Sequence, residues 1–151
     1  MSDPQSWQGL RPARILLIED NPDDIELTRR VFQRGHLDNP LTVIENGREA
    51  LDLLLREVNR TDRPPYDLLL LDLTLPGLDG RALLQELQAD KRLRRIPVVV
   101  LTGSQRDEDW ITAYKTGAVA FLRKPFDLER FLTVIGDLHG YRILIMRDPG
   151  S

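Results

Sequence analysis

The stretch that decides the fold is Tyr66 to Gly80, which reads YDLLLLDLTLPGLDG. Four consecutive leucines end at a carboxylate, Asp72, and turn-forming residues follow it. An apolar run of this length, bounded by turn residues, is typical of a strand buried on both faces in a parallel sheet. We therefore expect Asp72 at the carboxyl end of a central strand, where open α/β sheets bind their ligands.

Four further apolar runs predict four more strands, at residues 14–18, 41–45, 96–101 and 119–122. Amphipathic segments lie between them, and their expected helix starts are Asn21-Pro22, Asn46-Gly47, Asp79-Gly80, Gln105 and Asp127. The helix from Gln105 to about Lys115 is expected to be closed by Gly117. Strict alternation of five strands with five helices predicts right-handed crossovers and a doubly wound parallel sheet.

Composition favours a globular protein and excludes several kinds of site. The 151 residues are 41% hydrophobic and 30% charged, which fits one ordinary folded domain. The formal net charge of −3 gives no general electrostatic reason to bind nucleic acid or an anionic membrane. The chain has no cysteine, so disulfides, thiolate catalysis and cysteine-ligated zinc are excluded. No secretory signal and no apolar run of about 20 residues is present, which predicts a cytoplasmic protein.

Three regions are expected along the chain. Residues 1–12 are predicted to form a flexible N-terminal tail, and residues 13–139 the folded domain. Residues 140–151 form an apolar C-terminal extension that contains YRILIMR and is too short for another domain. We expect this extension to dock on its own domain or on a second subunit, which would support a homodimer.

Polar side chains follow the predicted strands at one edge of the sheet. They are Glu19, Asp20, Asp72, Thr102 and Lys124. Three carboxylates close together raise one another's pKa unless a cation lies among them, and hard oxygen ligands of this kind suit Mg²⁺. With the metal in place, Asp72 stays ionised and can attack a phosphorus atom. Thr102 and Lys124 can then donate hydrogen bonds to the phosphoryl oxygens.

These residues and their spacing resemble the receiver domain of two-component response regulators, over about residues 13–139. The matching positions are Glu19-Asp20, Asp72 with Pro76 and Asp79-Gly80, Thr102, Phe121 and Lys124-Pro125. The resemblance implies a flavodoxin-like receiver fold with strand order 2-1-3-4-5 and a sensor histidine kinase as phosphoryl donor. It implies no enzyme activity beyond self-phosphorylation from a donor and self-dephosphorylation.

The same resemblance implies a role for each site residue. Asp72 would be the phosphoacceptor, and Asp20 and Asp72 would bind Mg²⁺ directly. Glu19 would act on the metal through water, and Thr74 through its backbone carbonyl. Thr74 and Ser104 occupy the positions that tune the lifetime of the phosphate.

The resemblance also describes a switch. The Lys124-Pro125 bond is expected to be cis, which would aim the lysine at the phosphoryl group. On activation Thr102 would shift toward that group and Phe121 would rotate inward. Trp110, with Tyr114 four residues further along, is placed on the surface formed by the fourth helix, fifth strand and fifth helix. We predict that Trp110 anchors a protein contact, the alternative being that it packs across its own helix.

Asp23 and Asp24 are interpreted only as favourable charges in the first turn of a helix. The stretch IPVVVLTGSQR at 96–106 and the apolar tail narrow the resemblance to stand-alone regulators paired with phytochrome histidine kinases. A bacteriophytochrome is therefore the expected kinase, and a surface switched by phosphorylation the expected output.

Two other functions are considered. A phosphotransferase of the haloacid-dehalogenase kind also uses a strand-end Asp with Mg²⁺, but it needs a second Asp where this chain has Thr74. A receiver-like binding module that is never phosphorylated would not need the complete set of acids, hydroxyl and lysine.

Overall fold

The computed structural model describes residues 12–113, 116–138 and 145. The strands in this part of the chain are β1 (Ile15–Ile18), β2 (Leu41–Ile44), β3 (Leu68–Asp72), β4 (Val98–Thr102) and β5 (Ala120–Arg123). The helices are α1 (Pro22–Arg34), α2 (Gly47–Thr61), α3 (Gly80–Ala89), α4 (Gln105–Ala113) and α5 (Leu128–Gly136). A short 3-10 helix, η2 (Leu93–Arg95), precedes β4.

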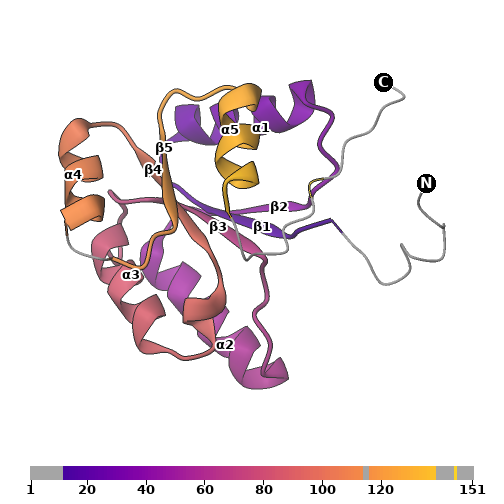
Figure 1. Ribbon diagram of the computed structural model, residues 1–151. Helices are drawn as coiled ribbons and strands as arrows, with labels where there is room; N and C mark the ends of the chain where they lie inside the picture. Colours follow the sequence, from indigo (N-terminus) through magenta and orange to yellow (C-terminus); the bar gives the residue numbers. More distant parts are fainter. Residues whose placement is uncertain (1–11, 114–115, 139–144, 146–151) are drawn as a thin grey trace.

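All strand pairs are parallel, and the sheet order is β2-β1-β3-β4-β5. Helices α1 and α5 cover one face, and α2 and α3 cover the other (Figure 1). The predicted doubly wound sheet and its strand order are therefore confirmed. Because all strands run in one direction, their carboxyl ends share one edge of the sheet.

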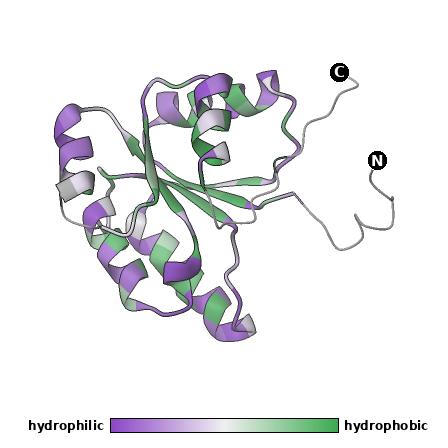
Figure 2. Ribbon diagram, viewed as in Figure 1, coloured by the Kyte–Doolittle hydropathy of each residue, from purple (hydrophilic) through white to green (hydrophobic). Residues whose placement is uncertain are grey.

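The leucine run of β3 is uninterrupted because both of its faces are buried. Leu68 and Leu70 pack in the cluster beneath α1 and α5, whereas Leu69 and Leu71 pack in the cluster beneath α2 and α3. All four leucines are fully buried. Figure 2 shows mainly hydrophobic strands inside the fold and helices that alternate hydrophobic with hydrophilic residues. This buried strand is a rigid support for the acid at its end.

The helix starts follow the predicted capping residues. The Asn21 side chain accepts hydrogen bonds from the backbone N–H groups of Asp23 and Asp24, and Pro22 is the first residue of α1. Asn46 caps α2, and Asp127 caps α5 in the same way. These side chains satisfy donors that every helix N-terminus leaves free.

A few boundaries differ from the sequence prediction. The sequence prediction did not include the short helix η2 between α3 and β4, where Leu93 is buried and its N–H donates to Asp90 Oδ1. Strand β5 runs to Arg123 rather than Leu122, since Arg123 pairs with Thr102. The predicted end of α4 at Lys115 lies outside the described residues.

The predicted N-terminal tail and most of the C-terminal extension also lie outside the described residues. The exception in the extension is Ile145, which is half-buried and packs against the cluster beneath α1 and α5. Among the described helices, none has the length and apolar character needed to span a membrane.

Candidate functional site

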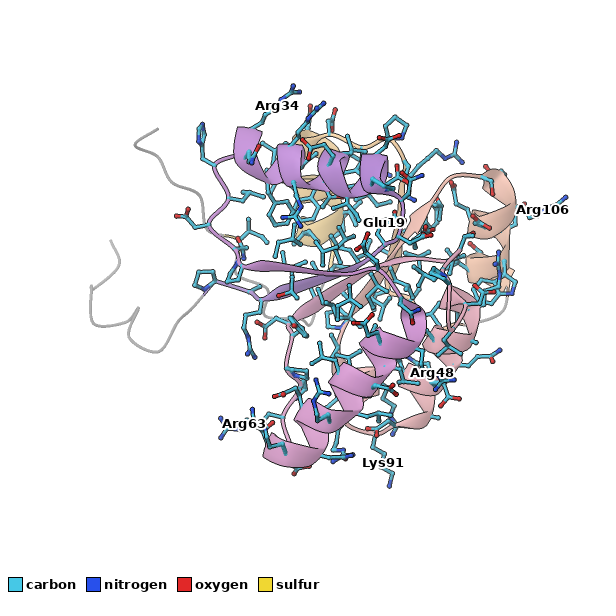
Figure 3. All side chains as sticks on the ribbon, turned by 180° about the vertical axis from the view of Figure 1, so that it is seen from behind. Glu19, Arg34, Arg48, Arg63, Lys91 and Arg106 are labelled. Carbon is cyan, nitrogen blue, oxygen red and sulfur yellow. The ribbon has the colours of Figure 1, made fainter. Side chains whose placement is uncertain are left out.

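The carboxyl ends of the strands bring three acids together. Glu19 and Asp20 follow β1, and Asp72 ends β3, which lies beside β1 in the sheet. One carboxylate oxygen from each of the three lies within 4.8 Å of the others. Glu19 is fully buried, Asp20 is exposed and Asp72 is half-buried, so the group runs from the interior to the surface. In Figure 3, Glu19 lies inside the fold, unlike the labelled surface residues Arg34, Arg48, Arg63, Lys91 and Arg106.

Lys124, which follows β5, supplies a positive charge to these acids. Its Nζ donates hydrogen bonds of 2.7 Å to Glu19 Oε1 and 2.7 Å to Asp24 Oδ2, and it lies 3.5 Å from Asp72 Oδ2. Burial alone would lower the pKa of Lys124, but the hydrogen bonds to Asp24 and Glu19 raise that pKa above its ordinary value. The lysine is therefore an ammonium at neutral pH. The Lys124-Pro125 bond is cis, as expected.

Glu19 holds its proton more tightly than an ordinary glutamate. Burial, and then hydrogen bonding to Asp72, raise the pKa of Glu19 to about 7, although the bond to Lys124 acts in the opposite direction. A carboxyl in this position is partly protonated near neutral pH when no metal is bound. Binding of a divalent cation would favour its ionised form.

The raised pKa of Glu19 predicts a pH-dependent stability. The folded state holds a proton that the unfolded state releases at the ordinary value of 4.5, so stability falls as pH rises from there through about 7. In metal-free buffer, the free energy of unfolding of the wild type should fall relative to Glu19→Gln, by up to roughly 3 kcal/mol between about pH 5 and 8. Urea denaturation across this range measures the difference. Parallel curves for the two proteins would contradict the prediction.

An open pocket of about 530 Å³ lies over Asp20 and Asp72, the two more exposed acids of the group. Its lining residues are Asp20, Asn21, Pro22, Asp24, Asp72, Thr74, Gly103, Asp107 and Lys124. The Thr74 N–H is 3.3 Å from Asp72 Oδ1, which orients the carboxylate. A pocket with carboxylates, one ammonium and an open mouth can hold a hydrated cation beside a small anion.

Thr102 lies at the same edge but does not line this pocket. Its side chain is fully buried, and its hydroxyl donates a 3.1 Å hydrogen bond to Glu108 Oε2, in the first turn of α4. Arg123 Nε donates to the same oxygen at 2.7 Å. The hydrogen bond from Arg123, followed by the bond from Thr102, lowers the pKa of Glu108 against the opposing effect of burial. Glu108 is therefore a carboxylate that holds the threonine hydroxyl.

Two acids of this arrangement were missed in the sequence. Asp24 was interpreted as a helix-start charge only, and that interpretation is corrected: it stands in the first turn of α1 but also accepts a hydrogen bond from Lys124. Because α1 starts at the edge where β1 ends, an acid in its first turn can face that edge, which was an available signal. Glu108 is separated from Thr102 by six residues, and no sequence pattern marked their contact.

Two of the three predicted switch and interface residues, Phe121 and Trp110, lie in the described part of the chain. Phe121 in β5 and Trp110 in α4 are half-buried against the cluster beneath α2 and α3. The guanidinium of Arg81 in α3 lies 5.1 Å from the centre of the Trp110 ring. Trp110 therefore contacts a neighbouring helix, not its own helix alone. Tyr114 lies outside the described residues, and the role of Trp110 as an interface anchor stays a prediction.

A family model of the response regulator receiver domain matches residues 15–136. The chain belongs to the response regulator receiver family. Members of this family are signalling proteins, and a receiver implies a histidine kinase partner. The resemblance inferred from the strand-end residues is thus confirmed.

The receiver is similar to several known response regulators, some of which are named as phytochrome response regulators. Response regulator Rcp1 of Synechocystis sp. is 33% identical over 140 residues, which are 93% of this chain and 95% of Rcp1. The structure of the bacteriophytochrome response regulator AtBRR is 39% identical with a TM-score of 0.76, covering 89% of this chain and 97% of AtBRR.

Two further structures of this kind carry ligands or modifications. The Mn²⁺-bound form of Rcp1 is 35% identical with a TM-score of 0.65, covering 82% of this chain and 89% of that chain. The phosphorylated cyanobacterial phytochrome response regulator RcpA is 33% identical with a TM-score of 0.66, covering 83% of this chain and 89% of RcpA. Receivers similar to this chain thus include one that binds a divalent metal and one that carries a phosphoryl group.

Proposed function

We propose that this receiver accepts a phosphoryl group on Asp72 from a sensor histidine kinase and thereby switches a protein-binding surface. The observation that carries the proposal is the meeting of Glu19, Asp20 and Asp72 within 4.8 Å, beside the ammonium of Lys124. Three acids close together, two of which line an open pocket, suit a cation and a phosphoryl group better than they suit any neutral ligand.

The acids fit a bound Mg²⁺. Asp20 and Asp72 would bind the metal directly, Glu19 would act through water, and Thr74 would offer its backbone carbonyl. A bound Mg²⁺ would offset the negative charge of the carboxylates and the phosphoryl oxygens during transfer. The position of Thr74 on the pocket lining agrees with its proposed role.

The transfer itself needs one nucleophile. A carboxylate oxygen of Asp72 attacks the phosphorus, a new O–P bond forms, and the bond from phosphorus to the donor atom breaks. Lys124 Nζ lies 3.5 Å from Asp72 Oδ2, so its ammonium group can donate a charged hydrogen bond to the phosphoryl oxygens. The Thr102 hydroxyl would supply a second donor after leaving Glu108.

Likeness to AtBRR and RcpA, which are named as a bacteriophytochrome and a cyanobacterial phytochrome response regulator, supports a bacteriophytochrome as the kinase. Phe121 and Trp110, with Tyr114, would form part of the output surface. The contact of Ile145 with the cluster beneath α1 and α5 supports docking of the C-terminal extension on its own domain. A homodimer through the same extension also remains a proposal, and loss of the dimer after truncation at Gly140 would support it.

The proposal predicts an acyl phosphate on Asp72. Incubation with Mg²⁺ and acetyl phosphate should give an adduct of one phosphoryl group that is stable to acid and labile to base, because it is a mixed anhydride. Intact-protein mass spectrometry detects it, and Asp72→Asn should abolish it while Asp52→Asn, an exposed acid on α2, should not. A wild type that forms no adduct would leave a binding module that is not phosphorylated. Rapid hydrolysis of a phosphate ester would instead favour a phosphotransferase.

A further inference from the structure

The side chains of Thr102, Glu108 and Arg123 form a connected group at the ends of β4 and β5. Thr102 and Arg123 are paired residues of these strands, and Glu108 lies in the first turn of α4. The Thr102 hydroxyl and Arg123 Nε both donate to one oxygen, Glu108 Oε2, at 3.1 Å and 2.7 Å respectively. Arg123 Nη2 also donates to Gln105 Oε1 at 3.1 Å, which ties the guanidinium to the start of the same helix.

A threonine hydroxyl carries one proton and can donate only one hydrogen bond at a time. In this structure the proton goes to Glu108, away from the pocket that Asp72 lines. Donation to a phosphoryl oxygen on Asp72 therefore requires that the bond to Glu108 is broken. The two acceptors compete for the same hydrogen.

Glu108 is a strong competitor. It is buried, with a relative exposure of 6%, and hydrogen bonds to ionised acceptors are stronger than those between neutral groups. Arg123 gives it a second donor, so Glu108 keeps a partner when the hydroxyl leaves. The group thus has two arrangements, with and without Thr102, and the strength of Glu108 as an acceptor biases the equilibrium between them.

We propose that Glu108 is a positioning residue that holds the Thr102 hydroxyl in the unphosphorylated arrangement, and that Arg123 limits how tightly it does so. This rests on the proposed phosphorylation of Asp72. Glu108 acts only through Thr102 and does not line the pocket. It sets how readily the receiver switches once a phosphoryl group arrives.

The test measures the affinity for beryllofluoride, an anion with the shape of a phosphoryl group, by titration calorimetry with saturating Mg²⁺. Glu108→Gln keeps the shape but removes the charge, so it should bind beryllofluoride about fivefold more tightly than the wild type. Asp109→Asn is the matched control, because it removes one charge from an exposed position on the same helix, and its affinity should equal that of the wild type. Arg123→Met should shift the affinity in the opposite direction, by roughly threefold, since Glu108 then keeps Thr102 as its remaining donor in this group.

A double-mutant cycle separates positioning from general structure. In a Thr102→Val background, Glu108→Gln should change the affinity by less than about twofold, because the hydroxyl through which Glu108 acts is absent. A gain that persists in that background, or no gain in the single variant, would overturn the role of Glu108. Failure of the wild type to bind beryllofluoride would overturn the proposed phosphoacceptor site, and this inference with it. Urea denaturation of each variant confirms that it is folded. If Glu108→Gln does not fold, the affinity of Arg123→Met tests the same role of Glu108.

Discussion

Lys124→Met is expected to lower the free energy of unfolding by about 3–5 kcal/mol near pH 8 in metal-free buffer, because it leaves the buried carboxylate of Glu19 without its cation. Glu19 is fully buried, and its 2.7 Å bond to the lysine would be lost together with the bond to Asp24. Methionine preserves most of the length of the side chain, so the change removes the charge and little packing. Equilibrium urea denaturation measures the loss.

The loss should shrink near pH 5.5, since Glu19 then binds a proton and no longer requires a counter-charge. The control is Lys91→Met, which removes the same charge from an exposed position between α3 and η2. Its effect should stay within about 0.5 kcal/mol at either pH. Equal losses for the two variants, or a loss at Lys124 that does not depend on pH, would contradict this account of the site.

Gly80→Ala is expected to destabilise the protein by about 1–3 kcal/mol or more, because the added methyl group has no space. A Cβ at this first residue of α3 would lie 2.5 Å from the Asp72 carbonyl oxygen and 2.6 Å from the Leu73 Cα. Both neighbours are backbone atoms at the end of β3, so they cannot turn aside as a flexible side chain can. Either the start of α3 or the strand end that carries Asp72 must move.

Because the displaced backbone includes Asp72, Gly80→Ala should also slow the uptake of phosphoryl groups from acetyl phosphate. Gly136→Ala, at the end of α5, is the matched control: within the described residues, its Cβ would meet no atom within 4 Å. Alanine there should be neutral or stabilising by up to about 1 kcal/mol. Urea denaturation and phosphorylation rates of the two variants give the comparison, and similar stabilities would show that the β3–α3 turn has space to relax.

The fold could be predicted from the sequence because its signals are local and repeated. The leucine run before Asp72 has no polar break and is bounded by turn residues, which is typical of a strand buried on both faces. The capping pairs at Asn21 and Asn46 mark helix starts by contacts that span two or three residues. Parallel strands then place Glu19, Asp20 and Asp72 at one edge without further information.

The parts that could not be predicted depend on side-chain directions across the fold. Asp24 and Lys124 are 100 residues apart in the sequence, and their contact requires both the start of α1 and the end of β5 to be placed accurately. Glu108 belongs to a helix whose acidic residues all look solvent-exposed in the sequence, yet the strand ends beside it supply two donors to one buried oxygen. The contact of Arg81 with Trp110 similarly joins two helices that no local pattern connects.

The contact between Arg81 and Trp110 makes Trp110 an intrinsic fluorescence probe of the pocket. The guanidinium that lies over the Trp110 ring also donates a 2.8 Å hydrogen bond to Asp107, and Asp107 lines the pocket. Arg81 therefore links the charge in the pocket to the Trp110 indole. The fluorescence emission of an indole depends on nearby charge. The chain has one other tryptophan, Trp7, so a Trp7→Phe variant would report from Trp110 alone. Occupancy of the pocket could then be followed over time by intrinsic fluorescence, with no attached label.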